Sequence, residues 1–299
     1  PYGTNGSKRI LNMIDFYSNV IQSGKEYALR TEKPDIIIAS SVHPLTMLAG
    51  IKLAKHLGVK CVCEVRDLWP ESIVTYMTKF SRSNPIIRVL YRGEKYIYRR
   101  ADAIIFTMEG GYDYIREQKW SNLIPKSKVY HINNGVDLDQ FEFNRNNCKI
   151  RDSDLDDESI FKVIYTGSIR KVNNLGTLLD IAKIIKNPRI RFLVWGDGDE
   201  LEKLKERVDI ENINNVVFKG RVDKKYIPFI TSSADLNLAH NNESPIFRFG
   251  ISFNKIFDYL AAGKPIICDF YAKYNPVISS GAGAVSYTHL RAHETGRNL

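Results

Sequence analysis

The stretch Phe161-Lys-Val-Ile-Tyr-Thr-Gly-Ser-Ile-Arg-Lys-Val-Asn-Asn-Leu175 contains the pattern that decides the fold of this chain. Its first part, 161–166, is a short apolar and β-branched run, which predicts a strand that is buried on both faces. From Leu175 to Ile185 the apolar residues recur at helical spacing, which predicts one buried face of a helix that stops before Pro188. A strand, a glycine-containing loop and a helix in this order are the repeating unit of a parallel sheet that is covered by helices.

The same alternation extends in both directions along the chain. Further strands are predicted at 35–40, 59–65, 103–107, 128–132, 190–195, 215–219, 234–239 and 265–268. The alternation pauses at 141–160, a polar stretch with an acidic cluster, and then restarts. The sequence therefore predicts an α/β protein with two Rossmann-like parallel-sheet domains, residues 1–140 and 161–284, joined by a linker at 141–160. Ligands of such sheets bind at the carboxyl ends of the strands, so we expect the site in a cleft that the two domains face.

The two ends of the chain do not continue this pattern. The first domain begins without a strand before its first helix, so we expect it to be truncated at its N-terminus. Residues 285–299 have no core-forming period and are similar to a translated sequencing-adapter tail, so we expect them to be non-native and outside the fold. His289 and His293 have a spacing that mimics a metal site, and we expect no metal there.

The composition restricts the class of protein. The chain has 299 residues, of which 43% are hydrophobic and 26% are charged, which excludes wholesale disorder, collagen and coiled coil. The apolar runs fall far short of the roughly 20 residues that span a bilayer. The net charge of +9 fits a phosphate-bearing ligand or an anionic surface as partner. The alternative is a solvated surface whose charge has no binding role. The cysteines lack metal-ligand spacing and are typical of a reducing cytoplasm.

Several short motifs occur in a fixed order along the chain. They are Glu64–Glu71, His131–Phe141 with the phrase Asn-x-Gly-Val-Asp-x-x-x-Phe, Tyr165–Lys171, Trp195–Glu200, Phe218–Val222, Ser233–Asp235 and Asn254–Pro265. In order and spacing the set resembles the family 4 glycosyltransferases, and the first motif is similar to their bacterial surface-polysaccharide branch. The resemblance covers roughly residues 1–284. It implies a GT-B fold and retaining sugar transfer from a nucleotide-sugar donor, UDP- or GDP-linked, without a catalytic metal or another cofactor.

The chemistry of that reaction indicates what the second domain must supply. Transfer of the sugar releases a nucleoside diphosphate, so the site must hold two phosphates and stabilise their developing charge. Backbone amides beside glycines, helix N-termini and fixed cations can do this. The resemblance also places the ribose at Asp258, whose alternative role is to favour the dipole of its helix. The predicted donor-binding residues are Gly167, Ser168, Arg170, Lys171, Gly196, Gly198, Arg221, Val222, Gly250, Ser252, Asn254, Lys255 and Asp258.

This chain departs from the family pattern at several donor-side positions. Relatives carry Arg directly after the glycine and Lys just before the helix, where this chain has Ser168 and Asn173. Arg170 and Lys171 are expected to substitute for them, although a solvated loop with two surface cations is the alternative. The first Glu of the family motif is Gly250 here, and nearby backbone amides are expected to serve instead.

The phrase Asp197-Gly-Asp199 looks like the Asp-x-Asp motif with which metal-dependent GT-A transferases hold a divalent cation. Its surrounding glycines are more typical of a tight strand-to-helix turn, so we predict no metal site there.

The first domain is expected to hold the acceptor. The candidate catalytic residues follow its strands and are His43, Arg66, Asp67 and Glu109. A lone loop histidine such as His43 is more often a helix cap than a catalyst, so capping is the alternative for this residue. Asp67 with Glu71 could be read as the carboxylate pair of a hydrolase, which nothing else in the sequence favours. The pair Gly110-Gly111 would let a substrate approach the backbone closely.

A helix predicted at 85–100 carries a basic stripe. The stripe consists of Arg88, Arg92, Lys95 and Arg99, and the inward face is expected to be Ile86, Leu90, Gly93 and Ile97. A basic amphipathic helix with aromatic residues fits an anionic membrane surface, and a solvated face is the alternative. The sequence contains no nucleic-acid recognition motif, so we predict no nucleic-acid partner.

Together these features predict a retaining glycosyltransferase of bacterial surface-polysaccharide biosynthesis, such as capsule, O-antigen or exopolysaccharide. Its partners would be a nucleotide-sugar donor, a saccharide or polyprenyl-linked acceptor, and the anionic membrane as a peripheral contact. It would be cytoplasmic, at the inner face of the cell membrane. The alternatives are a sugar-nucleotide 2-epimerase and a non-catalytic nucleotide-binding fragment.

Overall fold

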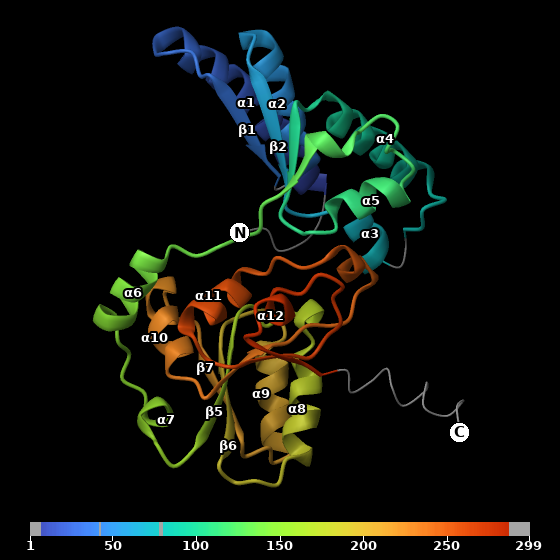
Figure 1. Cartoon of the computed structure of the whole chain (residues 1–299). Coiled ribbons are helices and arrows are strands. Elements are labelled where there is room, and N and C mark those ends of the chain that lie inside the picture. The colour runs from blue at the N-terminus through green and yellow to red at the C-terminus, as the bar shows by residue number, and fades with distance from the viewer. Residues whose placement is uncertain (1–6, 42, 78–79, 287–299) are drawn as a thin grey trace. The chain divides into compact units, whose positions relative to one another are not determined.

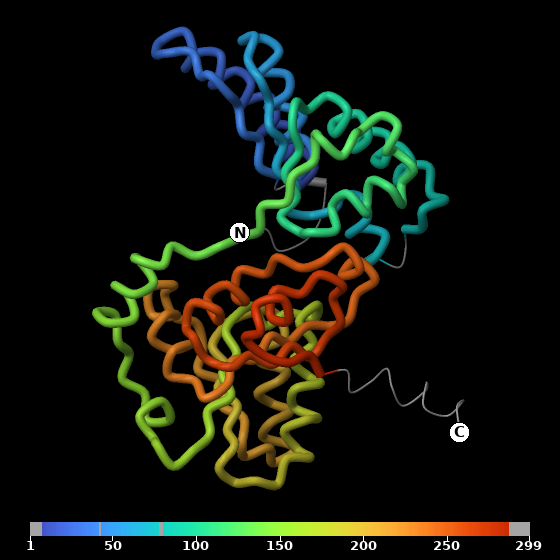
Figure 2. The backbone as a smooth tube through the Cα atoms, in the orientation of Figure 1, coloured from blue at the N-terminus to red at the C-terminus, as the bar shows by residue number. Residues whose placement is uncertain are grey.

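The computed structural model describes residues 7–41, 43–77 and 80–286. The chain forms two compact units, and each is described by itself. Unit 1 contains residues 1–133 and 248–251, and unit 2 contains residues 134–247 and 252–299. Figure 1 labels the helices and strands, and Figure 2 traces the backbone.

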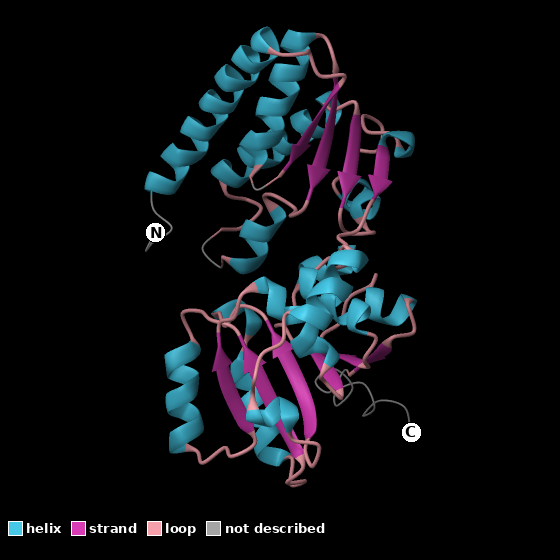
Figure 3. Cartoon of the chain, turned by 90° about the vertical axis from the view of Figure 1, so that its left-hand side faces the viewer, coloured by secondary structure: helices cyan, strands magenta, loops and turns pink. Residues whose placement is uncertain are grey.

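Unit 1 is built around a four-stranded parallel sheet with the order β1-β2-β3-β4. Its elements are α1 (Ser7–Arg30), β1 (Ile36–Ser40), α2 (Pro44–Leu57), β2 (Lys60–Val65), α3 (Glu71–Tyr76), α4 (Pro85–Arg100), β3 (Ala103–Phe106), α5 (Gly111–Glu117), the 3-10 helix Lys126–Lys128 and β4 (Val129–His131). Pro44 opens α2, and Gly58 ends it with a φ of 65°, a backbone conformation that glycine adopts readily. The four arrows of this sheet run in one direction in Figure 3, so their carboxyl ends share one edge.

Unit 2 contains a six-stranded parallel sheet with the order β10-β9-β8-β5-β6-β7. Its first elements are α6 (Leu138–Asn147), α7 (Ser153–Asp156), β5 (Phe161–Thr166), the 3-10 helix Lys171–Asn173, α8 (Leu175–Ile184), β6 (Ile190–Trp195), α9 (Leu201–Ile210) and β7 (Val216–Gly220). The rest are the 3-10 helix Lys224–Tyr226, α10 (Ile227–Ser232), β8 (Leu236–Ala239), α11 (Asn254–Ala262), β9 (Ile266–Cys268), α12 (Pro276–Ser279) and β10 (Gly283–Val285). The 3-10 helix Pro245–Phe249 begins in unit 2 and ends in unit 1.

The central strand β5 shows why its sequence is almost entirely apolar. Val163 and Tyr165 pack on one face of the sheet with the buried side chains of α8 and α9. Ile164 packs on the opposite face with residues of α7 and α10. Both faces are therefore covered, as the apolar run at 161–166 predicts.

The predicted fold class is confirmed: the chain is α/β with two parallel sheets, and every predicted strand is present near its expected position. The stretch 141–160, expected to be a linker, contains α7 and most of α6, and α6 contacts α10 of unit 2. Phe141 anchors α6 because its side chain is buried, which the polar composition around it concealed.

The C-terminal boundary also differs from the expectation. Val285, placed in the expected tail, belongs to β10 and pairs with Cys268 of β9. Three backbone pairs are enough to add this short strand to the edge of the sheet. A strand of three residues is too short to show an apolar period in the sequence, so the sequence analysis missed it. His289, His293 and the rest of the expected tail beyond Ser286 lie outside the described residues. No helix in 7–41, 43–77 or 80–286 is both long enough and apolar enough to cross a bilayer.

Candidate functional site

A pocket of about 500 Å³ lies at the carboxyl ends of β5, β6 and β7 in unit 2. We call it the β5–β7 pocket. It is lined by Gly167, Ser168, Arg170, Trp195, Gly196, Asp197, Gly198, Arg221, Val222, Asp223, Lys224 and Ile227. The structure thus brings together much of the predicted donor-binding set, drawn from three separate strand-to-helix loops, at the edge where parallel sheets bind ligands.

The glycines of this pocket are required by the packing of its loops. Gly196 has a φ of 153°, and a Cβ atom on it would lie 1.8 Å from the carbonyl oxygen of Gly167. A Cβ atom on Gly198 would lie 2.1 Å from the carbonyl oxygen of Ile169. The two loops are also joined by a hydrogen bond from Ile169 N to Asp197 O of 2.9 Å. The glycines therefore let the loops after β5 and β6 pack backbone against backbone, which fixes this wall of the pocket.

Cations of the pocket remain available for an anionic ligand. Arg170 and Arg221 are exposed, and neither forms an ion pair within residues 7–41, 43–77 and 80–286. Asp197 instead accepts a hydrogen bond of 2.8 Å from the amide of Gly198, as the turn interpretation of this motif expects. In the described part of the chain, no group of three or more His, Cys, Asp or Glu side chains is arranged to hold a metal ion.

The two positions where the family resemblance implies cations are occupied by a polar pair. Ser168 donates a hydrogen bond of 2.9 Å from its hydroxyl to the side-chain oxygen of Asn173. The carbonyl oxygen of Ser168 also accepts a hydrogen bond of 2.9 Å from the hydroxyl of Tyr165. The pair therefore shapes the loop after β5 and supplies no charge there.

Lys255 brings a cation to this loop from α11. Its Nζ lies 2.9 Å from the hydroxyl oxygen of Tyr165 and 4.1 Å from the centre of that ring. A Cβ atom on Gly167 would lie 2.9 Å from the same Nζ, so the amine occupies the space beside the glycine. Burial lowers the pKa of Lys255 to about 7, and Asp269 opposes this shift.

The remaining predicted donor residues lie outside the lining of the β5–β7 pocket. Lys171 lines a neighbouring cavity of about 560 Å³ between α8 and α9. Burial raises the pKa of Asp258, and Lys224 opposes this shift. Asn254 is exposed in the first turn of α11. Gly250 belongs to unit 1.

Ser252 has a structural partner that the sequence analysis missed. Asn134 donates hydrogen bonds from its backbone amide to the Ser252 hydroxyl (3.0 Å) and from its side chain to the Ser252 carbonyl oxygen (2.6 Å). Asn134 is the variable position of the Asn-x-Gly-Val-Asp phrase. The sequence therefore drew attention to the phrase, but it gave no sign that Asn134 contacts Ser252.

The candidate catalytic residues of unit 1 all follow the carboxyl ends of its strands, as predicted. His43 follows β1, Arg66 and Asp67 follow β2, and Glu109 follows β3. Glu109 is exposed, and the desolvation of Asp67 raises its carboxyl pKa while Arg66 opposes that shift. The backbone amide of Arg66 donates a hydrogen bond of 3.0 Å to the hydroxyl of Ser41, which holds the β1 and β2 loops together.

His43 stands at the N-cap of α2, yet its side chain makes no capping hydrogen bond. The ring is buried and contacts Phe16 edge-on at 5.6 Å between centroids. Its Nδ1 has no hydrogen-bond partner among the described residues. Burial and the charge of Arg9 lower the pKa of His43, which favours a neutral imidazole.

The pair Gly110-Gly111 serves internal packing, which corrects the expectation of substrate approach. A Cβ atom on Gly110 would lie 2.6 Å from the carbonyl oxygen of Phe249, and the Gly110 amide donates a hydrogen bond of 2.8 Å to that oxygen. A Cβ atom on Gly111 would lie 2.1 Å from the ring of Phe106. The space beside both glycines is therefore filled by neighbouring parts of unit 1.

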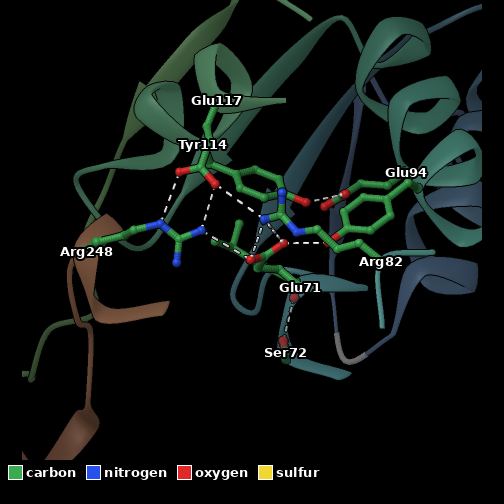
Figure 4. Close-up of polar contacts among 9 residues, drawn as sticks. Glu71, Ser72, Arg82, Glu94, Tyr114, Glu117 and Arg248 are labelled. Carbon is green, nitrogen blue, oxygen red and sulfur yellow. Dashed lines mark hydrogen bonds and ion pairs between the residues drawn. The ribbon is translucent and has the colours of Figure 1, made fainter. Parts of the chain in front are cut away.

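A polar network holds residues 248–251 in unit 1 (Figure 4). Arg82 binds both carboxylate oxygens of the buried Glu71, at 2.7 and 2.8 Å, and Arg248 approaches the same carboxylate at 3.2 Å. Arg248 also pairs with Glu117 at 2.7 Å, and the hydroxyl of Tyr91 donates to Glu71 at 2.5 Å. Glu71 is therefore fully engaged and does not form a carboxylate pair with Asp67. The sequence analysis missed Arg248, because its partners lie far away along the chain.

The inward face of α4 agrees with the expected one at Ile97 and differs from it at Ile86, Leu90 and Gly93, which are exposed. The residues that α4 buries are Ile87, Glu94, Ile97 and Tyr98. Ile86 is 63% exposed, since the helix is turned so that Glu94 faces inward and accepts hydrogen bonds from Tyr98 (2.8 Å) and Tyr114 (2.6 Å). In the described part of the chain, the basic stripe Arg88, Arg92, Lys95 and Arg99 forms no ion pair.

The chain is similar to known proteins over nearly its whole length. The model of Glycosyltransferase Family 4 matches residues 6–140, and the model of Glycosyl transferases group 1 matches residues 147–287. The probable glycosyltransferase WbjE of Pseudomonas aeruginosa is 23% identical over 240 residues, which cover 80% of this chain and 58% of WbjE.

Solved structures share the fold. Anabaena Alr3699/HepE in complex with UDP has a TM-score of 0.62 and 16% identity, covering 90% of this chain and 67% of that one. Sucrose-phosphate synthase of Thermosynechococcus elongatus has a TM-score of 0.65 and 17% identity, covering 91% of this chain and 65% of that one. With its first half matched by the Glycosyltransferase Family 4 model, its second half by the Glycosyl transferases group 1 model, and both sheets parallel, this chain carries one domain of each kind and has the GT-B fold.

Proposed function

We propose that this protein transfers a sugar, with retention of configuration, from a nucleotide-sugar donor to a saccharide or polyprenyl-linked acceptor. The observation that carries the proposal is the β5–β7 pocket, in which glycine-shaped loops and the free cations Arg170 and Arg221 meet at the carboxyl ends of three strands. This combination suits a diphosphate, because backbone amides and fixed cations stabilise its charge. HepE was solved in complex with UDP and with UDP-glucose, which supports a UDP-sugar as the donor here.

In the proposed mechanism, the acceptor hydroxyl attacks the sugar carbon on the face from which the diphosphate departs. The bond from that carbon to the phosphate oxygen breaks as the new bond forms, and the hydroxyl proton passes to a donor phosphate oxygen. The protein contributes positioning and stabilisation of the departing diphosphate. Fixed cations can supply the positive charge for this step, so we propose that the reaction needs no metal ion.

The acceptor side is proposed to lie in unit 1, at the carboxyl ends of β1, β2 and β3. Arg66, Asp67 and Glu109 offer polar groups there, and His43 offers a buried neutral imidazole. The role in surface-polysaccharide synthesis is supported by the motif at 64–71, and the match to the probable glycosyltransferase WbjE supports sugar transfer.

We propose that the protein acts in the cytoplasm and docks on the inner face of the cell membrane through α4. Next to the basic stripe, α4 exposes the apolar side chains of Ile86, Val89 and Tyr96. Cations beside exposed apolar groups suit an anionic lipid surface, where the apolar groups enter the headgroup region.

Chromatography of the products followed by mass analysis tests the proposed reaction, because an isomerised nucleotide sugar has the same mass as its substrate and is recognised by its retention time. The protein is incubated with UDP-glucose or GDP-mannose and a panel of saccharide and polyprenyl-linked acceptors, with magnesium and with EDTA. The expected result is an acceptor whose mass increases by one sugar, in EDTA as well. An isomerised nucleotide sugar would indicate the 2-epimerase instead. An unchanged donor and acceptor across the panel would indicate a non-catalytic fragment.

A further inference from the structure

The side chain of Lys255 is partly buried, and its amine contacts a tyrosine hydroxyl in place of a carboxylate. Its Nζ donates to the Tyr165 hydroxyl at 2.9 Å, and that hydroxyl in turn donates to the carbonyl oxygen of Ser168. No carboxylate forms an ion pair with this amine in the described part of the chain. Withdrawal of an ammonium group from water without an ion pair disfavours its charged form, and the ring of Tyr165, whose centre lies 4.1 Å from Nζ, offsets only part of this cost.

Asp269 is an acidic group whose charge acts on this amine and favours its protonated form, and its Oδ1 has no hydrogen-bond partner among the described residues. Asp269, which follows β9, pairs with His240, which follows β8, and the second ring nitrogen of His240 contacts the carbonyl oxygen of Asn174 at 2.8 Å. Tyr259, on α11 itself, contacts the backbone amide of Thr166 at 2.8 Å. Asp258, the remaining carboxylate of α11, faces the charge of Lys224.

The amine is placed beside the wall of the β5–β7 pocket. Gly167 lines the pocket and has no side chain, and a Cβ atom built on it would lie 2.9 Å from Nζ and 3.1 Å from Cε of Lys255. The Ser168–Asn173 pair brings no charge to the loop after β5. A diphosphate bound along this loop would therefore meet Lys255 as its counter-ion from α11.

We propose that the neutral amine of Lys255 takes up a proton when the diphosphate of a nucleotide binds beside Gly167. The resulting ammonium group is then the counter-ion of the diphosphate in the β5–β7 pocket. The inference rests on the proposed function and adds a coupling between donor binding and pH. The lowered pKa of about 7 supports it, because near pH 8 most of the amine is unprotonated before the ligand arrives. Binding then requires proton uptake, so nucleotide affinity falls as the pH rises above that value.

Isothermal titration calorimetry with UDP at pH 8, in buffers of different ionisation enthalpy, tests this coupling. The wild-type protein should take up close to one proton for each UDP bound. Lys255→Arg, which keeps a permanent charge, should bind UDP without that proton. Lys255→Met should also lose the uptake and bind about 10- to 100-fold more weakly, as the loss of a charged hydrogen bond predicts. Lys224→Met, at the lysine of the pocket lining, is the matched control and should keep the proton uptake.

Two results would overturn the inference, and they have different meanings. If the wild type and Lys255→Arg take up the same number of protons, Lys255 is not the coupled group, while the proposed function stands. If the folded wild-type protein binds neither UDP, GDP nor ADP, the proposed function fails and this inference fails with it. Thermal unfolding without nucleotide shows whether each variant is folded. If Lys255→Met does not fold, the comparison of the wild type with Lys255→Arg still decides the test.

Discussion

At the scale of single residues, the glycines of unit 2 show what a sequence can and cannot indicate. The spacing of Gly196 and Gly198 after a strand predicts a tight turn, and the turn is present. The reason that only glycine fits is the backbone of another loop, at Gly167 and Ile169. That contact joins residues far apart in sequence, so no local pattern encodes it.

Gly196→Ala tests this packing. The new Cβ atom would lie 1.8 Å from a carbonyl oxygen, on a backbone with a φ of 153°, so the loop must shift. We expect a loss of about 1–3 kcal/mol in the free energy of unfolding, measured in urea, together with weaker nucleotide binding. Gly93→Ala is the control, since nothing lies within 4 Å of the added atom in the exposed part of α4, and it should stabilise the helix slightly. Equal stability of the two variants would contradict this account.

Glu94 gives a prediction about pH. Burial raises the pKa of this carboxyl to about 8, although Tyr98 and Tyr114 donate hydrogen bonds to it. Between its ordinary value and pH 8, the folded carboxyl keeps a proton that the unfolded one releases. Each pH unit of increase in that window therefore lowers the free energy of unfolding by up to about 1.4 kcal/mol.

Glu94→Gln cannot ionise and should remove this contribution. The variant should gain stability relative to the wild type as the pH rises from 5 to 8, measured by urea unfolding across the range. A difference between the two proteins that stays constant with pH would show that Glu94 ionises normally in the folded state.

At the scale of elements, strands were easier to predict than helix faces. Apolar runs such as 190–195 and 234–239 carry their own signal, because both faces of a central parallel strand are buried. The face of α4 was predicted from the spacing of Ile86 and Leu90, yet the helix buries Glu94 instead. A carboxylate that is buried against two tyrosines of the fold has no signature in apolar spacing.

The proposed membrane contact is a prediction about α4 as a whole. Replacing Arg88, Arg92, Lys95 and Arg99 by Gln should weaken binding to phosphatidylglycerol vesicles and leave transfer to a soluble acceptor unchanged. Replacing Lys183, Lys186, Lys203 and Lys205 of unit 2 by Gln changes the net charge equally and is the control. Vesicle sedimentation measures both variants. If both lose binding equally, the overall charge and not α4 attracts the membrane.

At the scale of the whole molecule, residues 248–251 are the feature that the sequence concealed most completely. They fold with unit 1, whereas the chain on either side of them folds with unit 2. Arg248 and Phe249 hold them there, through Glu117 and through the edge-on contact of Phe249 with Tyr114 at 5.3 Å. Order along the chain predicts two sequential domains and gives no sign of such an inserted segment.

Arg248→Met should release this segment. The ion pairs are partly exposed, so we expect a loss of about 1–2 kcal/mol in the stability of unit 1. Hydrogen exchange of the Gly110 amide, which donates to Phe249 O, should become faster. Arg116→Met removes only the exposed pair with Asp113 and should change neither quantity measurably. Unchanged exchange at Gly110 in Arg248→Met would show that the segment is held by Phe249 alone.

The most direct test of the central claim is thermal unfolding with UDP, GDP and ADP, each in EDTA and in magnesium. At about 100 times its dissociation constant, a nucleotide stabilises the folded state by roughly 2.7 kcal/mol, which a shift in Tm reveals readily. We expect one of the three to raise the Tm in EDTA, and Gly198→Ala to reduce that shift. Cooperative unfolding at the same temperature with every nucleotide would contradict the proposed donor site, and a shift only with magnesium would contradict metal independence.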